Sequence, residues 1–241
     1  MRSIDRLFLK LERRDKLSED ERAALERVVA RTETYRPDKD IAVEGVPQTE
    51  SRLLLSGITC RYKGLSNGKR QITALHIAGD FIDLHSFTLK KLDHNVAAMT
   101  PVTLAVVPHD ALREITETMP HLTRVLWLNT MLDAAIHREW VVALGRKSAT
   151  AHVANLLCEM YLRNQIVGLT SENGYDLPLT QGDMADVCGL TDVHVNRVMQ
   201  ELRATGAVEW KSGRVTVHDW DALQRIAEFD PAFVHLEHLP R

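Results

Sequence analysis

The spacing of apolar residues changes twice along this 241-residue chain, and the first pattern is helical. Ser18 and Glu21 have the S-x-x-E spacing of a capping box, which is typical of a helix N-terminus. Leu25, Val28 and Val29 follow at helical spacing. The sequence therefore predicts a short first helix that begins near residue 18.

From residue 34 to about residue 107, the apolar residues stand in short runs that suit strands. The runs are IAV, RLLLSG, ITCRY, QITALHI, VAAM and VTLAVV. Turn residues separate them: Pro37-Asp38, Gly57, Ser66-Asn67-Gly68 and Gly79-Asp80. This alternation of strand and turn signals predicts an all-β region, a small antiparallel sandwich or roll.

After Pro108 the spacing is helical again, over residues 110–117, 120–144 and 149–164. The long middle helix carries an apolar stripe with spacings of three and four, close to a heptad, and Asn129 stands at an inner position. The stripe is formed by Leu122, Leu126, Asn129, Leu132, Ile136 and Trp140. We expect a parallel homodimer through this stripe. The alternative is a helix that packs on its own β domain and leaves Asn129 in solvent.

The segment LTQGDMADVCGLTDVHVNRVMQELRATG contains two short apolar-periodic runs, 181–188 and 192–205, separated by one break. Each run has one apolar face, so the two helices can pack on each other. Gly189 can adopt the left-handed conformation of the turn, and Thr191 can cap the second helix. This pattern predicts a helix-turn-helix.

The second of these helices turns a mixed set of hydrogen-bonding and apolar side chains outward, which suits the reading of base edges. The set is Asp192, Val193, Asn196, Arg197 and Gln200. The following run AVEWKSGRVTV reads as two strands around residues 211–214, a hairpin wing. Two packed helices also occur in purely structural bundles, but the wing favours the DNA-binding interpretation.

Composition adds few constraints. The formal net charge is −3, and residues 146–241 contain nine lysines and arginines against thirteen aspartates and glutamates. Local placement of cations must therefore carry any affinity for DNA. The charged N-terminal segment and the absence of a long apolar run disfavour a signal peptide or membrane span, so we expect a cytoplasmic protein. Three widely spaced cysteines disfavour a disulfide framework or an iron–sulfur cluster.

The order of these parts resembles the bacterial transcription regulators of the CRP/FNR type, over nearly the whole chain. The motifs that carry the resemblance are Gly79-Asp80-Phe81-Ile82, Leu144-Gly145-Arg146-Lys147 and the helix-turn-helix with its wing. The implied fold is α+β: an N-terminal β-roll, a long dimerisation helix and a C-terminal winged helix-turn-helix. We place the domains at residues 1–118, 119–145 and 146–241.

The resemblance also implies roles for single residues. Asp192, Val193, Asn196 and Arg197 fall where the family reads bases. The positions that fall on DNA phosphates, or lie in the wing where a duplex can meet them, are Gln181, Thr191, His194, Lys211 and Arg214. Many members have a glutamate three residues ahead of a Ser-Arg pair, whereas this chain has Val193 there, so we expect a different operator.

The effector region of the roll departs further from the family. The expected pocket positions are Gly79, Asp80, Asp83, Leu84, His94 and Asn95. In the cyclic-nucleotide members, a Gly-Glu pair holds the ribose and an Arg-Ser pair holds the cyclic phosphate. Asp83-Leu84 and His94-Asn95 stand at those places here, and neither pair supplies the same anchors. We expect a degenerate pocket, no response to cyclic AMP and an unknown effector. His76 and His85 are the candidates for haem, although a lone histidine is usually structural.

A dimeric regulator that binds a palindromic operator is the function these observations favour, with RNA polymerase as a further partner if it activates transcription. The alternatives are a β-roll that binds small molecules without a DNA target, a cupin-like enzyme and a protein-interaction module. A cupin-like enzyme needs a His-x-His pair with a carboxylate for its metal, and the predicted roll has no such pair. We therefore assign no catalytic and no metal-binding residues.

Overall fold

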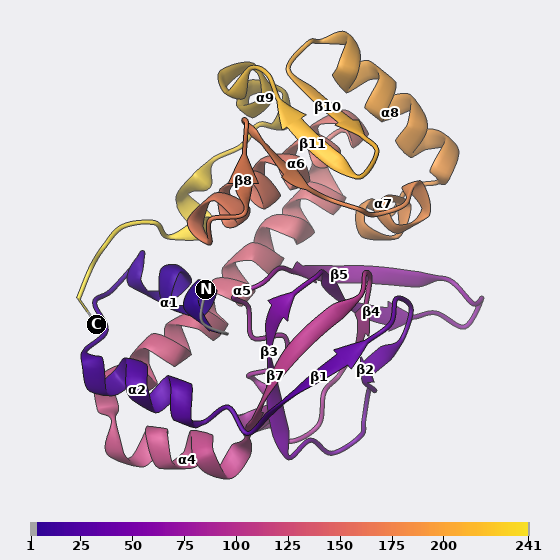
Figure 1. Ribbon diagram of the computed structural model, residues 1–241. Helices are drawn as coiled ribbons and strands as arrows, with labels where there is room; N and C mark the ends of the chain where they lie inside the picture. The colour runs from indigo at the N-terminus through magenta and orange to yellow at the C-terminus, as the bar shows by residue number, and fades with distance from the viewer. Residues whose placement is uncertain (1–3, 241) are drawn as a thin grey trace. The chain divides into compact units, whose positions relative to one another are not determined.

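The computed structural model describes residues 4–240, which form two compact units (Figure 1). The first unit contains residues 4–63, 74–134 and 235–240, and the second contains residues 64–73 and 135–234. The predicted domain limits after residues 118 and 145 divide the chain more finely than these two units, and they stay predictions.

Two antiparallel sheets form the β-roll that the sequence predicts. One has the strand order β1-β7-β3 and the other β2-β6-β4-β5. The strands are β1 (Arg31–Tyr35), β2 (Asp40–Ala42), β3 (Glu50–Ser56), β4 (Thr59–Gly64), β5 (Arg70–His76), β6 (Asn95–Ala98) and β7 (Val102–Pro108). Six of the seven coincide with the six apolar runs. β1 was missed because its sequence, RTETY, has no buried residue and no apolar alternation.

Four helices lie against this roll in the first unit: α1 (Asp5–Glu12), α2 (Glu19–Arg27), α4 (His109–Thr118) and the start of α5 (Pro120–Arg146). The capping box of α2 is present in full, as expected. α1 was not predicted, although Leu7, Phe8 and Leu11 follow helical spacing and are buried. A further short helix, α3 (Ser86–Leu89), follows the Gly79-Asp80 turn.

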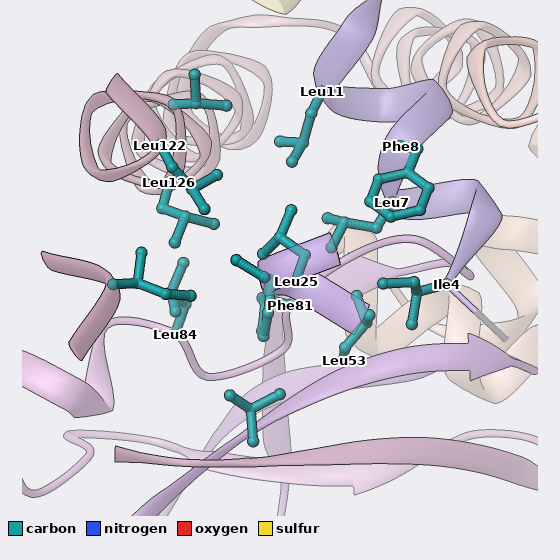
Figure 2. Close-up of a cluster of buried hydrophobic side chains, with 14 of the residues drawn as sticks. Ile4, Leu7, Phe8, Leu11, Leu25, Leu53, Phe81, Leu84, Leu122 and Leu126 are labelled. Carbon is teal, nitrogen blue, oxygen red and sulfur yellow. The ribbon is translucent and has the colours of Figure 1, made fainter. Parts of the chain in front are cut away.

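Figure 2 shows how α1, α2 and α5 converge on the core of the first unit. Leu7 and Phe8 of α1 point toward Leu25 of α2, while Leu122 and Leu126 of α5 enter from the other side (Figure 2). Strand β3 contributes Leu53, and the Gly79-Asp80 turn is followed by Phe81 and Leu84 of the same cluster. Burial of side chains of this size contributes about 1.5–3 kcal/mol each.

The second unit holds the predicted helix-turn-helix and wing. Its helices are α6 (Ala149–Ile166), α7 (Gln181–Cys188), α8 (Asp192–Ala204) and α9 (Trp220–Ala227). Its strands, β8 (Thr170–Ser171), β9 (Gly174–Asp176), β10 (Val208–Lys211) and β11 (Arg214–Val217), form one antiparallel sheet in the order β10-β11-β9-β8. Neither β8 and β9 nor α9 was predicted. A 3₁₀ turn (Pro231–Val234) follows α9.

The cysteines and the helices can be compared with two expectations from the sequence, on disulfides and on membrane spans. The three cysteines, Cys60, Cys158 and Cys188, are buried thiols that form no disulfide, and burial raises the pKa of Cys158 and of Cys188 to about 12. Those two thiols therefore stay protonated at neutral pH. Within residues 4–240, none of the helices combines the length and the apolar character that crossing a membrane requires.

Candidate nucleic-acid interface and effector region

The helix-turn-helix is fixed at each end by local hydrogen bonds. Thr180 and Asp183 form a reciprocal capping box at the start of α7, where the Asp183 amide donates to Thr180 Oγ1 at 3.0 Å. Gly189 ends α7 in the left-handed conformation with φ 63°. The Thr191 side chain then accepts a bond from the His194 amide at the start of α8. The predicted left-handed turn at Gly189 and the predicted N-cap at Thr191 are confirmed.

Helix α8 has a buried face and an exposed face, as its pattern predicts. Val195, Val198, Met199 and Leu202 are buried. The residues predicted to read bases are all exposed: Asp192, Val193, Asn196 and Arg197. Val193 is 82% exposed, the largest exposed fraction among the exposed large apolar side chains of the described residues. Such a side chain can contact a thymine methyl group in a major groove.

Polar side chains on the exposed face of α8 are linked to one another and to α7. Asn196 Nδ2 donates to Gln181 Oε1 at 3.4 Å, and Gln200 Nε2 donates to Asn196 Oδ1 at 2.8 Å. Arg197 Nη2 lies 2.9 Å from His194 Nε2. These groups surround a shallow hollow that is lined by Gln181, Asp192, Val193, Asn196, Arg197 and Gln200. Sequence analysis did not anticipate this hollow.

Arg197 has one further partner on its own helix. Its Nε lies 3.7 Å from Glu201 Oε1, and its side chain is 68% exposed. An exposed pair one helical turn apart contributes only about 0.3–0.5 kcal/mol. The guanidinium is therefore free to change partners when DNA approaches.

The wing is formed by β10 and β11, which pair in antiparallel register from Val208 with Val217 to Lys211 with Arg214. Lys211 is exposed at the tip. Arg214 is held within the unit, because Nη1 donates to Asp176 Oδ1 at 3.1 Å and Nη2 donates to Ser171 Oγ at 3.0 Å. The two cations predicted to meet phosphates thus differ: Lys211 projects into solvent, whereas Arg214 connects the strands of the sheet.

The residues predicted for the effector pocket are mostly engaged by their own chain. Asp80 accepts a bond from the Ile77 amide and pairs with Lys10 Nζ at 2.8 Å. Asp83 is fully buried, and Arg52 occupies both of its carboxylate oxygens. Burial raises the pKa of Asp83, and the charge of Arg52 opposes this shift.

Three further positions of the predicted pocket are also accounted for. Leu84 belongs to the core cluster of the first unit. Asn95 Oδ1 accepts a bond from the Glu44 amide at 3.0 Å. Gly79 has φ 99°, and a Cβ there would lie 2.9 Å from the Arg6 carbonyl oxygen, so a side chain does not fit.

Sequence analysis missed the arginine that lies at the centre of this region. Arg61 of β4 donates to the Ile82 carbonyl through Nε and Nη2, and Nη2 also pairs with Asp133 of α5 at 3.0 Å. It thereby connects the loop after Gly79 with the long helix. His85 and His94 lie close enough that the charge of Arg61 helps to lower the pKa of both, after the larger effect of burial. No local sequence signal marks a residue that acts between such distant segments.

The stripe predicted for the dimer seam is covered by its own chain. Leu122, Leu126, Leu132 and Trp140 are buried and Ile136 is half-buried. Asn129, expected in solvent if the helix packs on its own β domain, is only 1% exposed. Among the described residues, neither Asn129 Nδ2 nor Oδ1 has a hydrogen-bond partner. The alternative interpretation, in which the helix packs on its own chain, is therefore right for the apolar residues of the stripe. It is wrong for Asn129, which is buried and not in solvent.

Other apolar side chains of α5 are exposed. Trp127 is 66% exposed, and Met131 and Val141 also project into solvent. Because an α-helix turns by about 100° per residue, these three lie on the side of α5 opposite the predicted stripe. Ala134 and Arg138 complete their spacing of three and four. Trp127, Met131 and Val141 are 49–66% exposed within residues 4–240, and we call the surface that they form the exposed α5 face.

A winged helix-turn-helix with an exposed recognition helix, in a chain that also carries an antiparallel β-roll, defines a DNA-binding transcription regulator. The comparisons with known proteins agree. Residues 151–226 match the Crp-like helix-turn-helix domain, and residues 32–119 match the cyclic nucleotide-binding domain.

Two relatives and one solved structure give the family. The transcriptional activator protein FnrL of Cereibacter sphaeroides is 31% identical, with 70% of this chain and 69% of that protein covered. The nitrogen fixation regulation protein FixK of Azorhizobium caulinodans is 26% identical, with 83% and 86% covered. The structure of FixK2 from Bradyrhizobium japonicum has a TM-score of 0.75 and 27% identity, with 82% and 97% covered. The chain belongs to the CRP/FNR family of transcription regulators.

Because part of the chain matches a cyclic nucleotide-binding domain, we compare the predicted effector pocket with the needs of a cyclic nucleotide. The pocket residues do not fit this ligand. The Asp83 carboxylate is bound by Arg52, and Leu84 packs in the core. His94 donates its Nδ1 proton to Asp93 instead of presenting a guanidinium to a phosphate. The region keeps the fold of the domain without its nucleotide anchors.

Proposed function

We propose that this regulator acts as a homodimer that reads a palindromic operator with α8, using Asp192, Val193, Asn196 and Arg197 for bases. The observation that carries the proposal is the exposed face of α8, which combines the apolar Val193 with amide and guanidinium donors. Single apolar side chains are common on protein surfaces, so it is the combination of Val193 with the donors around one hollow that supports base reading. Direct readout in a major groove uses such a mixed surface.

The proposed phosphate contacts are Gln181, Thr191, His194, Lys211 and Arg214. Two of these side chains already have hydrogen-bond partners within the chain. Thr191 Oγ1 caps α8, and the Arg214 guanidinium is bonded to Ser171 and Asp176. Gln181 and Lys211 are exposed. The local cations offset the acidic balance of residues 146–241, so phosphate attraction here depends on position.

The test compares Arg197→Ala with Lys211→Ala on a selected operator and on scrambled DNA. If Arg197 forms a bidentate pair with a guanine, worth about 1–3 kcal/mol, its loss weakens operator binding by about 5- to 150-fold. The preference at one base pair in each half-site should also disappear. The effect on scrambled DNA should be small. Equal losses on both DNAs would contradict the base-reading role.

Lys211→Ala is the matched control for charge. A lysine that touches only phosphate weakens binding to every sequence alike, and its removal lowers the salt slope by about one because one fewer counterion is released. Gel shifts over a salt series measure both quantities. A sequence-selective loss for Lys211→Ala would mean that the wing reads bases as well.

The dimer is proposed to form through α5, with the exposed α5 face as the contact. Trp127, Met131 and Val141 follow the spacing of a helix seam, and their burial in a second copy removes apolar surface from water. The effector remains unidentified, because the residues at the nucleotide positions have other partners in the chain.

A further inference from the structure

Two histidines of the first unit lie side by side with nitrogens that no residue satisfies. His85 precedes α3 and His94 precedes β6, and their ring centroids are 5.2 Å apart. The Nε2 atoms of both rings are buried, and neither has a hydrogen-bond partner among residues 4–240. A buried polar atom without a partner costs about 1–3 kcal/mol, so two in one place need an explanation.

The protonation state of His94 follows from its neighbour. Its Nδ1 lies 2.7 Å from the Asp93 carboxylate, which accepts but cannot donate when ionised. Nδ1 therefore carries the proton. In the neutral ring, Nε2 then presents a bare lone pair. A carboxylate on the far nitrogen of an imidazole is the usual support for a metal-bound histidine.

The Nε2 atom of His85, like that of His94, is buried and has no hydrogen-bond partner among residues 4–240. An imidazole coordinates a metal through an unprotonated nitrogen, and Nε2 is the nitrogen that each ring leaves available. A ring centroid lies about 3.2 Å from a zinc ion bound at 2.0–2.1 Å, and two rings at a tetrahedral angle then have centroids about 5.2 Å apart. The observed separation matches this value.

The charges around the pair are close to balance. Arg61 and Lys63 both help to lower the pKa of His94 and so disfavour a cation, but each has an acidic partner. Arg61 pairs with Asp133, and Lys63 pairs with Glu44. Asp93 adds a negative charge, and its pKa is lowered mainly by its bond to His94.

We propose that His85 and His94 form a two-histidine binding site for a divalent transition metal of the zinc type, with Asp93 as the residue that orients His94. The described residues contain no group of three or more histidine, cysteine or acidic side chains that could hold a metal. Water therefore completes the coordination, and the site is open to an exchangeable ligand. It connects the loop before α3 with the start of β6. This inference does not depend on DNA binding.

The test uses the full-length protein, stripped of metal with a chelator and without DNA. Zinc chloride is titrated by calorimetry, and cobalt chloride by its visible absorption, which is strong for tetrahedral coordination. We expect one equivalent per chain. His85→Ala or His94→Ala should abolish this binding, and Asp93→Asn should weaken it by about 10- to 100-fold, because the histidine loses its orienting partner.

His218→Gln is the control, since this exposed histidine belongs to the second unit. It should bind metal like the unchanged protein. Asp93→Asn keeps both imidazoles, so weaker metal binding by this variant indicates a lost orienting bond and not lost ligands. Circular dichroism checks that every variant is folded. The proposal is overturned if no saturable binding occurs at millimolar zinc, which would leave only water between the rings. Equal binding by the His85, His94 and His218 variants would overturn it too.

Discussion

His121 shows how one residue makes the stability of this protein depend on pH. Its Nδ1 lies 2.6 Å from Glu21 Oε1, and its Nε2 lies 3.1 Å from Asp15 Oδ2. These bonds, first that to Glu21, raise the pKa of His121 despite partial burial. Burial acts to raise the pKa of Glu21, but bonds from Ser18 and His121 lower it overall. The imidazolium thus holds α5 to the segment that enters α2.

The sign of the pH effect follows from these shifts. A raised histidine pKa contributes stability that is fully present below the unfolded value near 6.5 and is lost as the pH rises through the higher folded value. His121→Gln should therefore reduce the free energy of unfolding by about 1 kcal/mol more at pH 6 than at pH 9, after allowance for solvent exposure. Urea unfolding at both pH values measures this difference.

His137→Gln is the control for that measurement, since His137 is an exposed histidine of the same helix. Its effect on unfolding should be near zero at both pH values. A loss of stability from His121→Gln that is the same at pH 6 and pH 9 would show that the imidazolium is not what stabilises the pair of contacts.

Within the helix-turn-helix element, the chain direction changes at Gly189. Its φ of 63° is in the left-handed region, which costs most L-residues about 1–2 kcal/mol. The amide of Gly189 donates to the Ala185 carbonyl, which satisfies the end of α7. The angle between α7 and α8, and hence the presentation of Val193 and Arg197, depends on this conformation.

Gly189→Ala should lower the free energy of unfolding by about 1 kcal/mol and weaken DNA binding, because the turn is strained. Gly189→Asn should cost less, since asparagine enters the left-handed region more easily. Urea unfolding and gel shifts of both variants test the pair. Equal losses of stability and DNA binding in both variants would show that side-chain volume, and not backbone conformation, causes the loss.

On the scale of the whole molecule, the long helix α5 has a buried stripe and an exposed face. The stripe that includes Leu122 and Leu126 packs into the core of its own chain, so it cannot also meet a partner (Figure 2). The exposed α5 face has no such cover. A dimer of this regulator is therefore expected to use the exposed face.

Met131→Asp should turn the dimer into a monomer at micromolar concentration, because it would bury an unpaired charge at the contact. Sedimentation velocity measures the change. Leu9→Asp is the matched control, an exposed leucine on α1 that should leave the dimer intact. If the unchanged protein is already a monomer, or if Met131→Asp remains a dimer, the exposed α5 face is not the interface.

The sequence by itself determined the features that rest on local spacing. The six apolar runs, the capping box at Ser18, both helices of the helix-turn-helix and the wing could be read from it, because side-chain period and turn chemistry act within a few residues. The roles of Gly189 and Thr191 followed from the same local rules. The helical spacing of Leu7, Phe8 and Leu11 in α1 is equally local, although α1 was not predicted.

The tertiary structure alone decided which side of an element meets which neighbour. The heptad-like stripe on α5 has the same spacing whether it packs on its own chain or on a second one, and only contacts with distant segments, such as the bond from Trp140 to Glu159, decide between the two. The same holds for Arg61 with Asp133 and for His85 with His94, whose partners are distant in sequence. Local patterns fix periods and turns, whereas contacts between distant segments depend on the packing of the complete core.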